Sequence, residues 1–322
     1  MPDEEQPLAA EWQQWIAANL LEGASTEEIV HGLVEEGLEE ARARSEVQEL
    51  RRSPILAAAR PFVADAKRRE LILRLERERV REFDIEARTG LDADAFHRHY
   101  RAANRPVLLP DFARAWSALQ RWTFSYLKET FGDAEVSAMD GREADPDYDR
   151  HQAKLSAPTT LGAFIERLEQ TPKSNDFYIV ARDGALRSPA LQGLWDDVDI
   201  DDAFFETDVQ KGSALWLGPG GTLTPLHHDQ SDILFVQIRG EKRVRLIAPC
   251  EESIAEGARG LYGPAPLPAE VRVHEQTLVP GDTLFIPVGW WHEVEALSPS
   301  ISLAINAFHG NRNGWYVPGS VR

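Results

Sequence analysis

The fold is decided by residues 213–249, SALWLGPGGTLTPLHHDQSDILFVQIRGEKRVRLIAP. Three apolar runs, at 214–217, 233–238 and 244–248, are separated by Gly/Pro and charged breaks. Apolar runs of this length between turn residues predict strands joined by turns. The stretch therefore predicts three successive strands of a β-rich domain.

Between the first two runs lies His227-His228-Asp229. Residues i and i+2 of an extended chain point to the same face. His227 and Asp229 can therefore aim an imidazole and a carboxylate at one point, while His228 faces the other way and is predicted to be a neighbour. An imidazole with a carboxylate is most of the 2-His-1-carboxylate triad, which holds non-haem Fe(II) and leaves positions open for co-substrates.

A second stretch, residues 280–295 (PGDTLFIPVGWWHEVE), offers the third ligand. It contains a predicted turn, a predicted strand at 283–286, a Pro/Gly break and then His292. A lone H-x-D is mostly structural, and a histidine after two tryptophans can be an ordinary core residue. Because both pieces lie at strand ends between turn signals, we predict that His227, Asp229 and His292 form the metal site and catalytic centre.

The spacing of these residues resembles the two cupin motifs. G-x5-H-x-D from Gly221 to Asp229 is similar to the first motif, with Asp in place of its second His, and G-x5-P-x-G-x2-H from Gly281 to His292 resembles the second. With Lys242 added, the chain resembles the JmjC/cupin branch of Fe(II)/2-oxoglutarate-dependent oxygenases. Within that branch it is similar to the asparaginyl-hydroxylase-like group typified by factor inhibiting hypoxia-inducible factor.

The resemblance implies a mainly β fold with α elements: a double-stranded β-helix (jelly-roll, cupin-type) core with a helical N-terminal region. It also implies bound Fe(II), with 2-oxoglutarate and O2 as co-substrates, in a dioxygenase that hydroxylates a C–H bond on a protein or peptide side chain. H-x-D in place of H-x-E favours hydroxylation over lysine demethylation. Three alternatives stay open: a small-molecule 2-oxoglutarate oxygenase, a non-catalytic cupin binding module, and a metal-dependent dioxygenase that needs no 2-oxoglutarate.

Lys242 shares strand parity with Val244 and Leu246, the apolar side of its strand. Lysine is almost never fully buried unless paired, so Lys242 either snorkels to water or faces an anion. Beside the metal triad we predict that it holds the distal carboxylate of 2-oxoglutarate, and the resemblance implies the same. The resemblance also implies contacts with 2-oxoglutarate from three further residues: Thr224, Tyr178 and Asn306. For Tyr178, a core position with a satisfied hydroxyl is the alternative.

The composition bounds the partners. A chain of 322 residues, 43% of them hydrophobic, can bury a large core in one or two domains. The single cysteine, Cys250, excludes a disulfide framework. The acidic N-terminus argues against a signal peptide, and the lack of a long apolar run argues against a membrane span. We therefore predict a cytoplasmic protein without a membrane partner. The net charge of −18 argues against nucleic acid and favours basic partners.

Residues 1–80 are predicted to be a helical N-terminal region and residues 81–322 the oxygenase domain. Ser25-Thr26-Glu27-Glu28 has the pattern of a capping box, and the charged segment 67–81 predicts a long exposed helix or connector. This region is either a cap on the barrel or a module for docking or dimerisation, so a homodimer is one outcome to test. The short segment after Phe308 leaves no room for the C-terminal dimerisation helices that the resemblance implies.

The resemblance implies that loops in segment 140–158 border the substrate entrance. Helices are expected at 119–131 and 159–169, and a strand at 176–182. The polar segment 140–158 is expected to be a mobile loop. The acidic run from Asp196 to Asp202, followed by Glu206, is either a rim that receives a basic substrate or only a solvated edge.

Overall fold

The chain divides into two compact units, Met1–Glu78 and Arg79–Arg322, and each is described by itself. Among the described residues, the first unit holds only helices, and the second holds every strand. The computed structural model describes residues 8–81, 83–181, 184–205 and 209–309.

The first unit is a small helical bundle, which confirms the predicted helical N-terminal region. Its helix α2 begins at the predicted capping box: the Ser25 hydroxyl accepts a hydrogen bond from the Glu28 amide, and the Glu28 carboxylate accepts one from the Ser25 amide. Its core includes the buried side chains of Ile16, Ile29 and Val47. The helices are α1 Ala10–Glu22, α2 Thr26–Glu35, α3 Glu40–Arg52 and the first part of α4 Pro54–Arg81.

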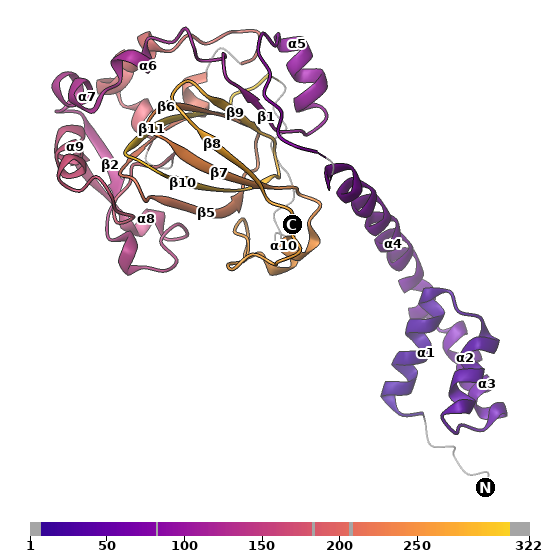
Figure 1. The fold of residues 1–322 in the computed structure, drawn as a ribbon. Coiled ribbons are helices and arrows are strands. Elements are labelled where there is room, and N and C mark those ends of the chain that lie inside the picture. The colour runs from indigo at the N-terminus through magenta and orange to yellow at the C-terminus, as the bar shows by residue number, and fades with distance from the viewer. Residues whose placement is uncertain (1–7, 82, 182–183, 206–208, 310–322) are drawn as a thin grey trace. The chain divides into compact units, whose positions relative to one another are not determined.

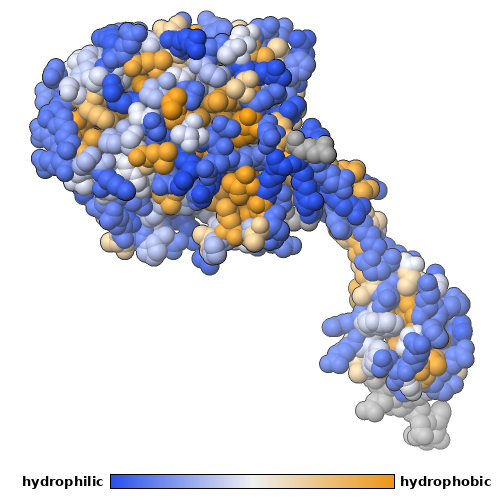
Figure 2. Space-filling view, in the orientation of Figure 1, coloured by the Kyte–Doolittle hydropathy of each residue, from blue (hydrophilic) through white to orange (hydrophobic). Residues whose placement is uncertain are grey.

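Helix α4 contains the division between the two units. It has 28 residues and begins before the predicted 67–81 segment, with Pro61 inside it. Among the described residues, no helix is both long and apolar enough to cross a membrane. Hydrophobic patches along α4 are visible in Figure 2, and the large apolar side chains exposed on it are Ile55, Phe62, Leu71, Ile72 and Leu75.

The second unit is built on two antiparallel sheets stacked face to face (Figure 1). The larger sheet has the order β1-β9-β6-β11-β4, and the smaller has the order β5-β10-β7-β8. This pairing of sequence-distant strands gives the predicted double-stranded β-helix core. The strands are β1 Val107–Leu109, β4 Ser213–Gly218, β5 Leu223–His228, β6 Ile233–Arg239, β7 Lys242–Ile247, β8 His274–Leu278, β9 Thr283–Ile286, β10 Trp291–Ala296 and β11 Ser300–Ile305.

Strand β7 shows how the sequence pattern sets the core. Its buried side chains are Lys242, Val244 and Leu246. The residues that alternate with them, Arg243 and Arg245, form ion pairs with acidic side chains of β8 and β10. Successive side chains of a strand point to opposite faces, so the alternation of charge and apolarity fixes which face looks inward. Lys242 therefore points inward together with the apolar residues, as its parity predicted.

Helices cover the outside of the core. Two of them differ from the helices that the sequence predicted. The helix expected at 119–131 is two helices: the first ends at Arg121 with Trp122 as its C-cap, and Thr123 caps the second by accepting a hydrogen bond from the Tyr126 amide. The helix expected at 159–169 starts later, since residues up to Thr160 pair as strand β3 with β2. The elements here are α5 Ala93–Phe96, a π-helix His97–Arg101, α6 Ala118–Arg121, α7 Phe124–Phe131, β2 Glu135–Met139, β3 Ser156–Thr160, α9 Leu161–Gln170 and α10 Glu252–Gly257.

The polar segment 140–158 contains regular structure that the sequence did not predict. It forms a 3₁₀ turn at Arg142–Ala144, helix α8 Gln152–Leu155 and the start of β3. The strand expected at 176–182 is reduced to two single bridges, Met139 with Tyr178 and Ile179 with Leu217. The last residue of that expected strand, Arg182, lies outside the described residues.

The acidic run is not a rim of the predicted metal site. Asp197 is 2% exposed; it forms an ion pair of 2.6 Å with Arg121 and accepts hydrogen bonds from Ser117 and the Trp122 indole. The other acids of the run, from Asp196 to Asp202, are exposed, and none of the described ones lines the pockets at His227. Glu206 lies outside the described residues.

Two loops that carry metal-site residues are tied together. Asp232 accepts a hydrogen bond of 3.0 Å from the Val288 amide and forms a buried ion pair of 2.9 Å with Arg101 of the π-helix. The Gly289 amide also donates to the Asp229 carbonyl, at 3.3 Å. Gly289 has a φ of +81°, a left-handed conformation that favours glycine. The left-handed conformation explains why the second motif has a glycine at 289. The hydrogen bonds hold the loop before His292 against the loop after Asp229.

Candidate metal and co-substrate site

Neighbouring strands bring the predicted metal ligands together. Strands β5 and β10 pair antiparallel with His292 opposite His227, and Asp229 follows the end of β5 directly. The three side chains offer ligand atoms that all lie within 4.8 Å of one another. His292 Nε2 lies 3.5 Å from Asp229 Oδ2. The structure thus gathers at one point all three residues that the sequence predicted from two separate motifs.

Backbone carbonyl groups orient both imidazoles. His227 Nδ1 lies 2.8 Å from the Pro225 carbonyl oxygen, and His292 Nδ1 lies 3.0 Å from that of Trp290. Because a carbonyl oxygen only accepts, each Nδ1 carries the proton and each Nε2 keeps its lone pair for a metal. His228 points away, as expected from its parity, and packs its ring edge-to-face on Trp291 with centroids 4.5 Å apart.

The charges of the site also suit a cation. Burial lowers the pKa of His227, and the neighbouring His292 imidazole lowers it further. Burial acts to raise the pKa of Asp229, but the contact with His292 and the charge interactions with the adjacent imidazoles outweigh it and bring the pKa to about 2. A neutral imidazole and an ionised carboxylate are the forms that ligate metals. Two imidazole nitrogens and one carboxylate oxygen on one side fit non-haem Fe(II).

Lys242 lies fully buried beyond the ligands. Its Nζ donates a hydrogen bond of 2.9 Å to the Tyr178 hydroxyl and lies 5.2 Å from the ring centre of Phe235. It does not snorkel to water. Among the described residues no carboxylate pairs with it, and burial lowers the pKa of Lys242 to about 7. An ammonium held in this way has a strong preference for an anionic ligand.

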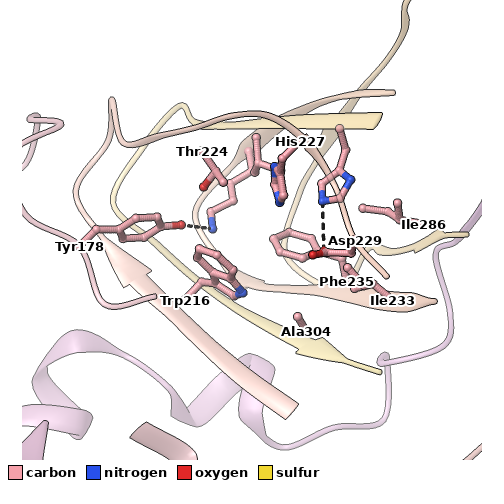
Figure 3. A pocket seen from close by; sticks show the side chains of 12 residues that line it. Tyr178, Trp216, Thr224, His227, Asp229, Ile233, Phe235, Ile286 and Ala304 are labelled. Atoms are coloured by element: carbon pink, nitrogen blue, oxygen red, sulfur yellow. Dashed lines mark hydrogen bonds and ion pairs between the residues drawn. The ribbon is translucent and has the colours of Figure 1, made fainter. Parts of the chain in front are cut away.

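A pocket connects Lys242 with the metal ligands. Figure 3 shows Tyr178 and Asp229 at opposite ends of this pocket, with Thr224 and Trp216 between them. The Thr224 hydroxyl is turned toward the hydrogen bond between Lys242 and Tyr178 (Figure 3). This inner pocket, of about 40 Å³, shares six lining residues with an outer pocket of about 370 Å³. The outer pocket gives the site its room.

Asn306 lies farther out than the resemblance implied. It lines the outer pocket and not the inner one, and its side chain is exposed. Asn306 follows the last residue of β11, whereas Ala304 on the same strand face lines both pockets. Ile233 also lines both pockets. The walls around the metal ligands are therefore largely apolar.

The outer pocket contains residues that the sequence did not single out. Asp149 is 7% exposed and accepts a hydrogen bond from the Gln152 side chain. Tyr262 pairs with His227 as a single bridge and donates its hydroxyl proton to the Asp149 carbonyl. Both lie in segments without apolar periodicity, so no pattern identified them. The only available signal was that 140–158 was expected near the substrate entrance.

The chain matches the family model of the cupin-like domain over residues 93–254 and 262–314. That match covers most of the second unit, including both metal-binding motifs. The chain belongs to the cupin-like domain family. The structure agrees, since the matched residues contain the two facing sheets and the His/Asp/His cluster.

Three relatives indicate which part of this cupin-like family is nearby. The chain is 29% identical over 222 residues to Jumonji C domain-containing protein 5 of Drosophila melanogaster, covering 63% of this chain and 54% of that protein. It is 28% identical over 236 residues to lysine-specific demethylase JMJ30 of Arabidopsis thaliana, covering 68% and 54%. It is 25% identical over 257 residues to human 2-oxoglutarate and iron-dependent oxygenase JMJD4, covering 67% and 58%. The aligned part therefore spans little more than half of each relative.

Proposed function

We propose that the Arg79–Arg322 unit is an Fe(II)- and 2-oxoglutarate-dependent oxygenase that hydroxylates a C–H bond of a protein or peptide side chain. The observation that carries this proposal is one pocket with two unlike ends. At one end three metal-ligating atoms lie within 4.8 Å of one another, and at the other a buried ammonium has no carboxylate among the described residues. A keto-diacid that chelates iron fits both ends at once.

The residues divide the work of binding. His227, Asp229 and His292 would hold Fe(II), which leaves positions open on the pocket side. Lys242, Thr224 and Tyr178 would hold the distal carboxylate, and apolar walls such as Ile233 exclude water. When bound, iron and 2-oxoglutarate supply the oxidation: O2 gives one oxygen atom to succinate and one to the substrate C–H bond, with release of CO2. The chain's own contribution is geometry and exclusion of side reactions.

The proposal is tested by succinate formation from 2-oxoglutarate. We expect the full chain with Fe(II) and O2 to form succinate and CO2 slowly alone and faster with a matching peptide. The peptide product should gain one oxygen atom by mass spectrometry; loss of a methyl group as formaldehyde would instead identify a demethylase. Stimulation by a metabolite but by no peptide would favour a small-molecule enzyme. No Fe-dependent turnover of 2-oxoglutarate at all would refute the proposal.

We infer further that the target side chain is basic. Asp149 lines both the outer pocket and an adjoining pocket of about 320 Å³, so its carboxylate lies where a substrate side chain would enter. A nearly buried carboxylate in a site mouth favours a cationic group, and the acidic chain would attract such a partner. The names of three relatives contain "lysine-specific demethylase", which is consistent with a basic target.

The Asp149→Asn variant tests this preference. We expect it to raise the KM for a lysine- or arginine-containing substrate by roughly tenfold, since a charged hydrogen bond is worth about 1.5–3 kcal/mol. The rate of succinate formation without substrate should be unchanged. The exposed Asp147→Asn, in the adjoining pocket, is the matched control. Equal KM values for Asp149→Asn and wild type would contradict a role of Asp149 in substrate recognition.

The narrower likeness to the asparaginyl-hydroxylase-like group stays a prediction from the motif spacing. It is supported by the positions of Thr224, Lys242 and Tyr178 around one end of the pocket. Two features favour a target other than the asparagine of that group: the apolar Ile233 in the wall of both pockets, and Asp149 at the mouth. A peptide library that varies the target residue, assayed by mass spectrometry, distinguishes asparagine from basic targets.

A further inference from the structure

A second buried cation, Arg142, lies behind the predicted co-substrate end of the pocket. Its side chain is 1% exposed, and its guanidinium carbon lies 4.4 Å from the ring centre of Tyr148 and 5.2 Å from that of Tyr178. The Tyr178 hydroxyl accepts the hydrogen bond from Lys242. One phenol is therefore in contact with two buried cations.

Arg142 is poorly satisfied for an arginine at this depth. Its Nη2 donates a hydrogen bond of 2.7 Å to the Leu223 carbonyl, but Nε and Nη1 have no partner in the described structure. No described carboxylate forms an ion pair with it, although Asp149 and Asp176 are near enough to act on its charge. Burial lowers the pKa of Arg142 from its usual range. A buried, unpaired guanidinium is costly to keep, which points to a use for its charge.

Arg142 also fixes the strand that carries Thr224. The Leu223 carbonyl, one residue before Thr224, accepts hydrogen bonds from Arg142 Nη2 and from the Tyr148 hydroxyl at 2.9 Å. The Leu223 amide donates to the Asn175 side chain at 2.9 Å. The backbone just before Thr224 is thus held on both its polar groups from outside the sheet.

Tyr178 is fixed just as closely. Its ring fills the space beside Gly218, where an added Cβ would lie 2.5 Å from the ring carbon Cδ2. With Gly218 on one side and the Arg142 guanidinium over its face, the ring cannot shift without breaking a contact. The hydroxyl is therefore presented to Lys242 in one place.

We propose that Arg142 is a positioning residue for 2-oxoglutarate, which holds Tyr178 and the backbone before Thr224 and adds a second positive charge that favours a dianionic ligand. This inference rests on the proposed function. It assigns selectivity for the distal carboxylate to Lys242 and Arg142 together. Neither the motif spacing nor the pocket lining includes Arg142.

The test compares two ligands on the full chain loaded with Mn(II), which is redox-inactive here. The ligands are 2-oxoglutarate and 2-oxopentanoate, which has the same chain length but no distal carboxylate. For Arg142→Gln we expect calorimetry to show that the Kd for 2-oxoglutarate rises by roughly tenfold. Losses of this size are typical when a residue that orients a ligand-binding side chain is removed. The Kd values for 2-oxopentanoate and for Mn(II) should stay unchanged, and Arg142→Lys should recover part of the loss.

Arg167→Gln is the matched control. Arg167 lies 4.1 Å from the ring centre of Phe177, the neighbour of Tyr178, but its side chain is 42% exposed and forms ion pairs with Asp140 and Asp176. It should leave the Kd for both ligands unchanged. If Arg142→Gln does not fold, Tyr148→Phe removes one hydrogen bond to Leu223 and keeps the ring; it should weaken 2-oxoglutarate alone, by a smaller factor.

The outcomes separate the two proposals. A wild-type chain that binds 2-oxoglutarate, with Arg142→Gln binding it equally well, overturns the role of Arg142 and leaves the proposed function standing. Equal weakening of 2-oxoglutarate and 2-oxopentanoate in a folded variant also overturns it, because general loosening of the pocket would do the same. A metal-loaded wild type that binds neither ligand overturns the proposed function and this inference with it.

Discussion

Replacing Asp229 with alanine is expected to abolish tight Fe(II) binding and to lower succinate formation by roughly a thousandfold or more. Asp229 supplies the negative charge among the three ligands, and its carboxylate is ionised down to a pKa of about 2. Without it, two imidazoles remain, on neighbouring strands with ring centres 4.1 Å apart. The measurement is the weak charge-transfer absorbance of the anaerobic Fe(II)–2-oxoglutarate complex, read beside succinate release.

The neighbouring histidine provides the control for this experiment. His228→Phe keeps a ring against Trp291, and His228 Nδ1 has no hydrogen-bond partner to lose in the described structure. Because His228 points away from the cluster, this variant should keep the absorbance band and the turnover. An Asp229→Ala protein that keeps the band, or a His228→Phe protein that loses it, would show that the metal is held elsewhere.

The parts of the site that the sequence predicted depend on short-range geometry. The alternation of side chains along a strand placed His227 with Asp229 and turned His228 away, and the same rule placed Lys242 among apolar residues. The motif glycines mark positions that require left-handed backbone, such as Gly221 with a φ of +89°. These constraints act over a few residues, so they can be seen in one sequence without its fold.

The parts that were missed depend on contacts between distant segments. Arg142 and Asp149 come from a polar stretch whose lack of periodicity predicted only a loop, and Tyr262 comes from another. Asp197 belongs to an acidic run that the sequence predicted at the surface. It is buried instead, in an ion pair with Arg121, which is far away in the sequence. Asn306 has the right strand parity but lies too near the strand end to reach the inner pocket. The spacing of residues in the sequence predicts which face of a strand a side chain points to. How deeply that side chain is buried depends on contacts between distant segments, which only the folded structure shows.

Lys242→Met is expected to have two opposite effects, which together distinguish a binding lysine from a structural one. The first is loss of 2-oxoglutarate binding by about thirtyfold or more, since removing one partner of a buried charge pair costs about 2–5 kcal/mol. The second is a gain in the stability of the ligand-free protein of roughly 1–4 kcal/mol near pH 7. Methionine fills the same space without an ammonium that the described residues leave without a counter-charge.

The pH dependence of the second effect follows from the pKa of Lys242, which burial lowers from 10.5 to about 7. Between these values the unfolded chain binds a proton that the folded chain does not, so the stability of the wild type rises with pH in this range. Below pH 7 the penalty is complete. The stability advantage of Lys242→Met should therefore be largest at pH 7 and below and shrink as the pH approaches 10. Urea unfolding of both ligand-free proteins at several pH values measures it.

A matched lysine and the ligand itself complete the argument. Lys128 is paired with Glu166 and Glu169, so Lys128→Met should leave the affinity for 2-oxoglutarate unchanged and should not stabilise the ligand-free protein at pH 7. Adding 2-oxoglutarate to the Mn(II)-loaded proteins should stabilise the wild type more than Lys242→Met, because the ligand supplies the counter-charge that the fold omits. A Lys242→Met protein that is less stable than wild type at pH 7 and still binds 2-oxoglutarate would make Lys242 a packing residue. The pocket would then need another cation to hold a diacid.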